Sequence, residues 1–175
     1  MDLKLVAYSG DCIVRGQVRL AGGRLTDQLN ASPDLVVEDA TLEALEDGRT
    51  VDVGLVTIPH EELYLIEVVG PRGDRERRVQ TVKQRLVAEL GIYRVSHTLH
   101  TPPTMDPMAW LRRRGRYIPA TDCDVEFTIA GLPALRRVDV LVINRDHVVS
   151  VRPSAVTALP ETFGHDLDVV RSPSA

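Results

Sequence analysis

The chain has 175 residues, with 21 Lys and Arg against 25 Asp and Glu, which gives a net charge of −4 at pH 7. Its hydrophobic fraction of 43% suits a packed globular core and excludes disordered and collagen-like chains. No apolar run approaches the roughly 18 residues that span a bilayer, no export signal opens the chain, and two cysteines make no disulfide scaffold. We therefore expect a soluble, cytoplasmic protein without a membrane partner.

Charge is unevenly distributed along the chain. Residues 1–70 hold 5 basic and 13 acidic side chains, residues 71–117 hold 11 and 4, and residues 118–175 hold 5 and 8. This pattern favours electrostatic complementarity within the molecule or between its copies. A phosphate-binding patch in the basic middle segment is the alternative.

The first 70 residues predict about five short antiparallel strands. Alternating polarity or apolar runs with turn signals between them place these strands at residues 3–8, 12–20, 35–42, 51–58 and 63–69. Residues 24–30 predict a short helical turn or a loop. Gly16 lies in the middle of the second strand and indicates a sharp bend, which suits a small barrel.

A helix is expected next, from Asp74 to Leu90 with Gly91 at its end. Apolar residues recur on one face at helical spacing, and the other face is rich in Arg and Lys. The helix is either a connector that packs through its apolar stripe or the lid of a second barrel. Further strands are predicted at residues 92–101, 117–129, 135–143 and 147–151, and Asp106-Pro107 begins a short helix.

The two halves of the sequence indicate an internal duplication. Asp39–Glu43 matches Asp122–Glu126 at an offset of 83, and Val53–Ile66 matches Val138–Val151 at an offset of 85. Upstream, Leu29 aligns with Leu111. Apolar positions coincide although identity is low, and the alternative is the general likeness of any two short-stranded β units.

The first copy resembles an Sm-like domain over most of residues 3–68. The resemblance rests on the bent second strand, on Asp27-Gln28-Leu29-Asn30, and on the strand that follows at Leu35–Ala40. Residues Ile58–Ile66 keep the apolar frame of the family's second motif without its Arg-Gly turn. The chain also resembles an uncharacterised bacterial family of small β proteins, through Arg24–Asn30 and Ile143-Asn144-Arg145.

Sm-like domains are five-stranded bent barrels that join edge to edge into rings, and many bind RNA in the lumen. The resemblance implies that Asn30 matches the base-holding Asn of the first motif. Arg145 could serve as the Arg of the second motif, but only in the second copy, where Arg112 takes the position of Asn30. Neither copy has the complete RNA pocket, whereas edge pairing suits β units with open edges.

No motif for catalysis, a cofactor or a metal is present. His97 and His100 are three apart on a strand, so they point to opposite faces and are poorly placed to share an ion. Cys12 and Cys123 are expected to pack as small hydrophobes. Asp39 and Asp122, at equivalent positions of the repeat, are expected to bond turn backbone rather than to act as an acid and base pair.

The most suggestive surface feature is an aromatic residue beside a run of arginines. Such a pair can stack bases and hold phosphates, and the alternative is that the tryptophan belongs to the core while the arginines face solvent or another subunit. The candidate anion or nucleic-acid contacts are Asn30, Trp110, Arg112, Arg113, Arg114, Arg116 and Arg145.

These observations predict a mainly β protein of two tandem Sm-like small bent-sheet barrels joined by one amphipathic α-helix. The expected segments are residues 1–70 for the first β domain, 71–91 for the connecting helix, 92–153 for the second β domain, and 154–175 for a C-terminal strap and tail. The expected function is a non-catalytic interaction or assembly module that associates with itself or another protein through strand edges. The alternatives are an RNA- or nucleotide-binding module that uses residues 72–116 and, last, an enzyme.

Overall fold

β-strands make up most of the structure. The computed structural model describes residues 2–21, 23–69 and 81–154. In the first part of the chain, the elements are β1 (Asp2–Tyr8), β2 (Cys12–Arg19), α1 (Leu25–Ala31), β3 (Asp34–Ala44), β4 (Thr50–Pro59) and β5 (Leu65–Val69). The later elements are β6 (Val82–Leu90), β7 (Tyr93–Thr101), α2 (Pro107–Arg113), β8 (Tyr117–Ile129), β9 (Leu132–Asn144), the short 3₁₀ helix η2 (Arg145–His147) and β10 (Ser150–Pro153). The prediction of a mainly β fold is confirmed.

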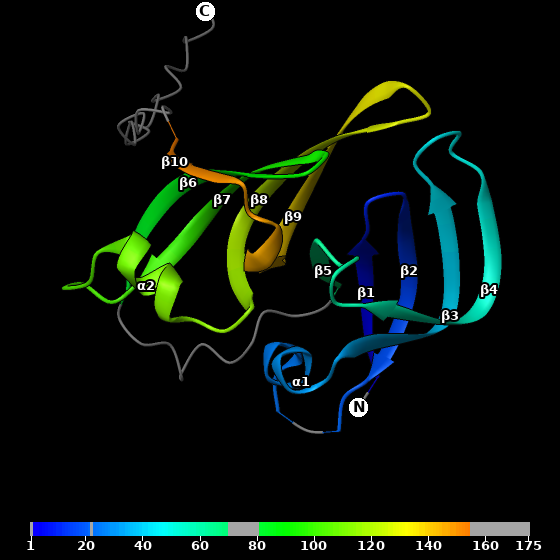
Figure 1. Ribbon diagram of the computed structural model, residues 1–175, viewed down its shortest axis with the longest axis horizontal. Helices are drawn as coiled ribbons and strands as arrows, with labels where there is room; N and C mark the ends of the chain where they lie inside the picture. Colours follow the sequence, from blue (N-terminus) through cyan, green and yellow to red (C-terminus); the bar gives the residue numbers. More distant parts are fainter. Residues whose placement is uncertain (1, 22, 70–80, 155–175) are drawn as a thin grey trace, which may run out of the picture.

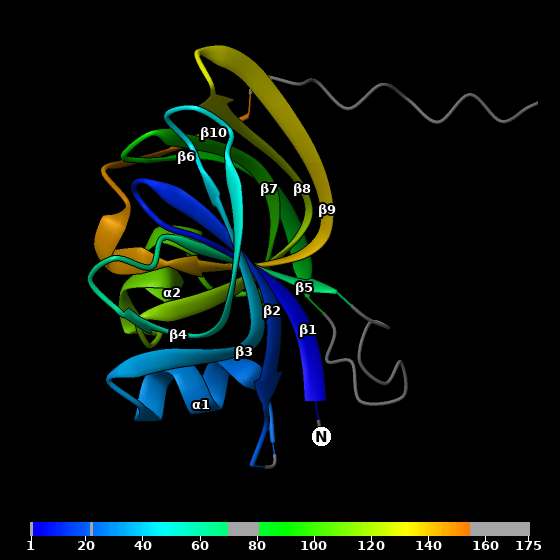
Figure 2. The same cartoon turned by 90° about the vertical axis from the view of Figure 1, so that its right-hand side faces the viewer.

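The strands form one continuous antiparallel sheet, in the order β10-β6-β7-β8-β9-β5-β1-β2-β3-β4. The order within β5-β1-β2-β3-β4 repeats within β10-β6-β7-β8-β9. We call residues 2–69 the N-terminal unit and residues 82–153 the C-terminal unit. The two units lie side by side, and β9 and β5 join them at the centre of the sheet (Figure 1). Figure 2 shows how strongly the long strands bend.

The units also agree in register at the offsets seen in the sequence. Leu35 pairs with Ile58 between β3 and β4, and Ile118 pairs with Ile143 between β8 and β9. The pairings of β2 with β3 and of β7 with β8 both shift register beside the equivalent aspartates, where Asp39 has a φ of 49° and Asp122 a φ of 53°. The same left-handed conformation therefore occurs in both units, at two residues that are 83 positions apart, as the sequence offset predicts.

The predicted helix over residues 74–90 is wrong for residues 82–90, which form strand β6 in full register with β7. Residues 70–80 lie outside the described part of the chain. Leu86, Val87, Ala88 and Leu90 are all buried, because β6 lies between β10 and β7 and contributes to the core. A short run that is apolar on both faces fits helical and strand periods alike. Gly91, expected to end a helix, adopts a φ of 54° in the two-residue turn to β7.

Two short helices occupy equivalent places, each between the second and third strands of its unit. The segment expected as a helical turn at residues 24–30 forms α1, and its first turn is closed by Asp27, which accepts a bond from the Arg24 N–H at 3.4 Å. The predicted cap of α2 is also present, since the Asp106 carboxylate accepts a bond from the Ala109 N–H at 2.7 Å. No helix in the described ranges is long and apolar enough to cross a membrane.

The largest hydrophobic cluster takes residues from both units. Tyr8, Ile13 and Leu65 of the N-terminal unit pack with Leu90 and Tyr93 of the C-terminal unit. The Tyr93 hydroxyl donates to the buried Ser9 carbonyl at 2.5 Å. The two units therefore share one core and form a single body.

Gly16 lies where β2 bends, and the register of β2 against β3 shifts at this residue. A Cβ atom there would lie 2.5 Å from Val37 Cγ1 and 2.6 Å from the Glu38 carbonyl oxygen. In β2, a side chain at this position would therefore clash with β3. His97 holds the equivalent position on β7, where the register against β8 shifts in the same way.

Candidate functional site

The junction of the two units is a short strand pairing between β9 and β5. Leu65 pairs with Ile143, Ile66 with Val142, and Glu67 with Leu141. An ion pair lies beside this ladder and links the same two strands, with Arg136 Nε 2.7 Å from Glu67 Oε2. A single three-residue ladder thus connects two five-stranded arrays.

Asn144 fastens the end of this ladder. Its side-chain amide donates to the His60 carbonyl at 3.0 Å and to the Leu63 carbonyl at 2.7 Å, and its backbone N–H donates to the Tyr64 carbonyl at 2.9 Å. The residue is 1% exposed. It therefore satisfies the backbone of the turn after β4 from within the other unit.

Tyr117 closes the core of the N-terminal unit from outside that unit. Its ring meets the His60 imidazole edge to face at 5.0 Å between centroids, and its backbone N–H donates to Asn30 Oδ1 at 3.3 Å. With Val142 it belongs to the cluster that contains Leu29, and it is 3% exposed. Burial raises the pKa of the Tyr117 phenol and lowers that of His60, where the Arg116 charge adds to the effect, so both rings stay neutral near pH 7.

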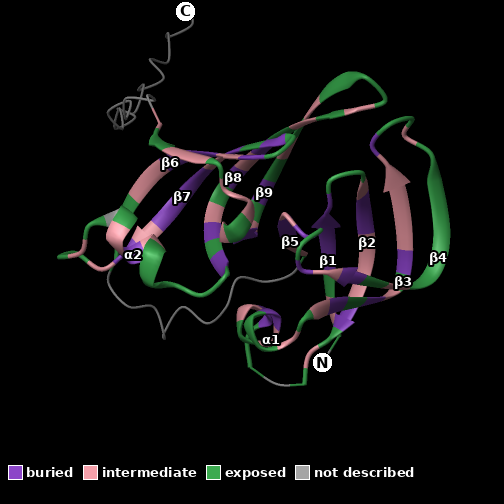
Figure 3. Ribbon diagram, viewed as in Figure 1, coloured by how far each residue is buried: buried purple, intermediate pink, exposed green. Residues whose placement is uncertain are grey.

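The two outer strands of the sheet, β4 and β10, each have an edge without a neighbouring strand among the described residues. Strand β4 is mostly exposed (Figure 3). On it, Val53 is 39% exposed, whereas its equivalent Val138 on β9 is 5% exposed. Leu55 is 63% exposed, and Thr57 is exposed where its equivalent Val142 is 2% exposed. The surface that β9 buries at the junction is therefore open on β4.

Several of the predicted anion contacts have partners within the chain. Trp110 is only 7% exposed, and the Arg114 guanidinium lies 4.2 Å from its ring centroid. Arg116 pairs with Asp146 at 2.7 Å. Arg145 Nη1 donates to three carbonyls at the end of α2, those of Leu111, Arg112 and Arg114 at 3.3, 3.2 and 2.6 Å. Arg145 therefore caps the end of α2, Arg116 forms an ion pair, and Arg114 stacks on the buried Trp110.

The other three predicted residues differ from one another. Asn30 donates to the Thr26 carbonyl at 2.6 Å and accepts the Tyr117 N–H, so its amide lies at the contact between the units. The side chains of Arg112 and Arg113 form no ion pair with any other residue that the structure describes. The predicted residues other than Arg112 and Arg113 have side chains that belong to, or contact, residues 114–117.

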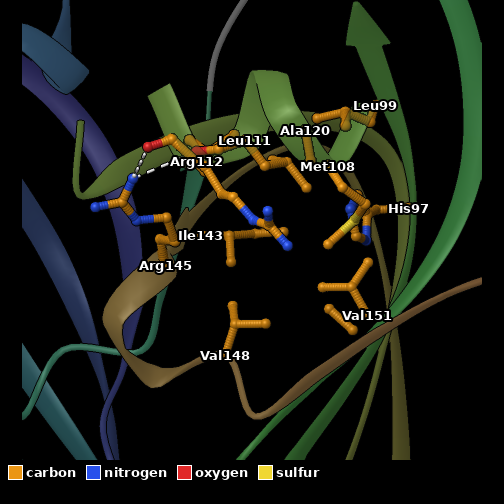
Figure 4. A pocket seen from close by; sticks show the side chains of 12 residues that line it. His97, Leu99, Met108, Leu111, Arg112, Ala120, Ile143, Arg145, Val148 and Val151 are labelled. Carbon is orange, nitrogen blue, oxygen red and sulfur yellow. Dashed lines mark hydrogen bonds between the residues drawn. The ribbon is translucent and has the colours of Figure 1, made fainter. Parts of the chain in front are cut away.

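A cavity of about 160 Å³ opens in the C-terminal unit between α2, η2 and β10. Arg112 points into it from α2, and Arg145 stands beside it with its guanidinium bonded to the helix carbonyls (Figure 4). The apolar lining is Ala88, Leu99, Met108, Leu111, Ile118, Ala120, Ile143, Val148 and Val151. The cavity therefore combines an apolar lining with the positive charges of Arg112 and Arg145.

His97 also lines this cavity. Its Nδ1 lies 3.3 Å from the Val95 carbonyl, and burial lowers the pKa of the imidazole to about 4. His100 turns elsewhere, with Nε2 2.8 Å from Thr121 Oγ1. In the part of the chain that the structure describes, no three His, Cys, Asp or Glu side chains are grouped to hold a metal. Cys123 is buried, and burial raises its thiol pKa to about 12.

Comparison of the chain with protein families, with curated proteins and with solved structures found no match. The site is therefore interpreted from its own geometry. Sequence reasoning did not single out Tyr117 or Asn144 as junction residues. The offsets of 83 and 85 align Tyr117 with Asp34 and Asn144 with Pro59, and a comparison of these unlike pairs is the signal that could have found them.

Proposed function

We propose that the chain is a non-catalytic, cytoplasmic assembly module of two tandem Sm-like units that associates head to tail. In this assembly, the outer edge of β4 in one copy pairs with the outer edge of β10 in the next, the two edges that no strand of the described residues covers. The observation that carries the proposal is the β9·β5 junction within the chain. Strand β4 is the equivalent of β9, and β10 is the equivalent of β5, so the same pairing can repeat between copies. A contact between two unlike surfaces of this kind builds a ring or an open filament.

The internal register predicts the intermolecular register. At the offset of 85, Ile58 of one copy would lie opposite Ser150 of the next, Thr57 opposite Val151, and Val56 opposite Arg152. No proline occurs in these two triplets. The Ser154 N–H donates to the Arg85 carbonyl on β6, so by strand alternation the polar backbone of Val151 faces the open edge.

Charge distribution supports a head-to-tail direction. The N-terminal unit, residues 2–69, carries a net charge of −8, whereas the C-terminal unit, residues 82–153, has 11 basic and 7 acidic side chains and carries +4. Opposite net charges on the two ends favour contact between unlike ends and oppose contact between like ends. The proposed association should therefore weaken as ionic strength rises.

Two differences make the proposed contact weaker than the junction it copies. Pro59 takes the place of Asn144, so the backbone donor and the two side-chain hydrogen bonds at the end of the ladder are missing. Thr57 takes the place of the buried Val142. Proline beside an open strand edge limits uncontrolled pairing, so we propose a reversible, concentration-dependent assembly.

Sedimentation velocity of the full chain over a wide concentration range tests the proposal. The apparent mass of the wild type should lie well above the 19.4 kDa of one chain, and it should fall on dilution. Thr57→Lys places a charge at the centre of the proposed ladder and should shift the protein to monomer. Thr128→Lys is the matched control, an exposed threonine in the β8–β9 hairpin. A wild type that remains monomeric at all concentrations would disprove the proposal.

Nucleic-acid binding by residues 72–116 is the alternative proposal. Its support within the described residues is the exposed pair Arg112 and Arg113, because Arg114 and Arg116 are engaged and Trp110 is buried. Retention of mixed RNA at low salt that is lost on Arg113→Glu would favour this alternative. Absence of retention would exclude it.

A further inference from the structure

The cavity of the C-terminal unit occupies the place that Tyr117 closes in the N-terminal unit. Arg112 is the equivalent of Asn30, and Arg145 is the equivalent of His60, the two residues that Tyr117 contacts. The lining residues Val148 and Val151 are half-buried, whereas their equivalents Leu63 and Ile66 are both 0% exposed. One unit is thus closed by a residue from its neighbour, and the other has the same opening with no such residue among those that the structure describes.

We infer that Asp34 of a second copy enters this opening and pairs with Arg112 and Arg145. The inference rests on the proposed head-to-tail assembly and specifies its contact. Asp34 begins β3 as Tyr117 begins β8, and the offset of 83 aligns the two residues. When β4 of the second copy docks on β10 in the register of the internal junction, Asp34 takes the place of Tyr117.

The residue exchanges are complementary on both sides of the contact. Within the chain, the Tyr117 ring meets a neutral imidazole, and the Tyr117 backbone N–H donates to the Asn30 amide oxygen. Between copies, a carboxylate would meet two guanidinium groups, one of which already points into the cavity (Figure 4). A carboxylate beside arginine forms short, charge-assisted hydrogen bonds. The second copy would therefore provide the charge that the cationic, apolar cavity lacks.

The positions of the two arginines suit this role. Arg145 is held by three carbonyls at the end of α2, so its charge is fixed beside the cavity. Arg112 is exposed and forms no ion pair among the described residues, which leaves its guanidinium available to a carboxylate. A misplaced neighbour that brings a neutral or basic residue to this opening would leave both charges unpaired, which gives the contact specificity.

Charge reversal tests the inference. Asp34→Arg and Arg112→Glu should each raise the dissociation constant of the full-length protein roughly tenfold or more in sedimentation velocity. The double variant should recover most of the wild-type affinity, because the pair is restored with opposite polarity. Arg113→Glu is the control, since Arg113 lies on the same turn of α2 but does not line the cavity. Circular dichroism of each variant verifies that the fold is kept.

The outcomes separate the inference from the proposed function. If the wild type associates and both reversals behave like Arg113→Glu, the Asp34 contact is wrong and edge pairing stands. The same holds if both single variants weaken association but the double variant recovers nothing. If the wild type never associates, both are wrong. If both single variants weaken association and the double variant restores it, the Asp34 contact is supported.

Discussion

The ring of Tyr117 lies edge to face on the imidazole of His60, with 5.0 Å between the two centroids. Tyr117 begins β8 in the C-terminal unit, whereas His60 follows β4 in the N-terminal unit. The core of one unit is therefore completed by the other. This dependence explains why the two units form one sheet and one body, and it makes Tyr117 the first residue to test.

Tyr117→Ala should destabilise the protein by roughly 3–5 kcal/mol, because it opens a cavity in a closed apolar cluster. Tyr117→Phe should be neutral or slightly stabilising, since the hydroxyl is buried with no hydrogen-bond partner in the described structure. Urea denaturation followed by circular dichroism measures both. A phenylalanine variant as unstable as the alanine variant would contradict the packing role.

Asn144→Ala should lower the free energy of unfolding by about 2–4 kcal/mol. The change removes the only side-chain donor to the buried Leu63 carbonyl among the described residues and leaves the His60 carbonyl with the Leu63 N–H at 3.3 Å alone. Asp146→Ala, two residues on, removes only a partly exposed ion pair with Arg116 and should cost at most about 1 kcal/mol. Denaturant titrations of the two variants measure both free energies of unfolding. Equal decreases would argue against the proposed role of the Asn144 side chain in holding the two units together.

Much of the architecture followed from local sequence signals. The Asp106 cap, the bend at Gly16 and the offsets of the repeat all appear in the structure. The error at residues 82–90 arose because Val82, Leu86, Val87 and Leu90 fit helical spacing, whereas the burial of Leu86, Val87 and Ala88 on both faces depends on strands that are distant in sequence.

The predicted site residues were limited by a similar problem. A sequence shows that Arg114, Arg116 and Arg145 are basic, but it does not show that a ring, a carboxylate and three carbonyls engage them. Those partners come from tertiary contacts. The contact between the units is likewise formed by positions at which the repeats differ, whereas the sequence comparison searched for positions at which they agree.

The protein should lose stability as the pH falls from about 6.5 to about 4. Burial, with the Arg85 charge as a minor contribution, lowers the pKa of His97 to about 4, whereas an unfolded histidine titrates near 6.5. In this window, the unfolded chain binds a proton that the folded chain does not, so acid favours unfolding by roughly 3 kcal/mol. Urea titrations at several pH values should show this slope. His97→Gln should flatten it, whereas His100→Gln should leave it in place.

Thr57→Val should strengthen the proposed association, in contrast to Thr57→Lys. Thr57 is the equivalent of Val142, which is 2% exposed at the internal junction. If Thr57 faces Val151 of the next copy, assembly buries its hydroxyl against an apolar residue, and valine removes that cost of roughly 1 kcal/mol. The dissociation constant measured by sedimentation should fall about fivefold.

Thr128→Val is the matched control for this gain, because it adds the same apolar surface to an exposed strand position that lies on neither β4 nor β10. General stickiness would tighten association equally in both variants. A gain confined to Thr57→Val would tie the effect to the β4 edge, since β4 lacks, among the described residues, the neighbouring strand that β9 has. No difference between Thr57→Val and the wild type would place the contact elsewhere on the molecule.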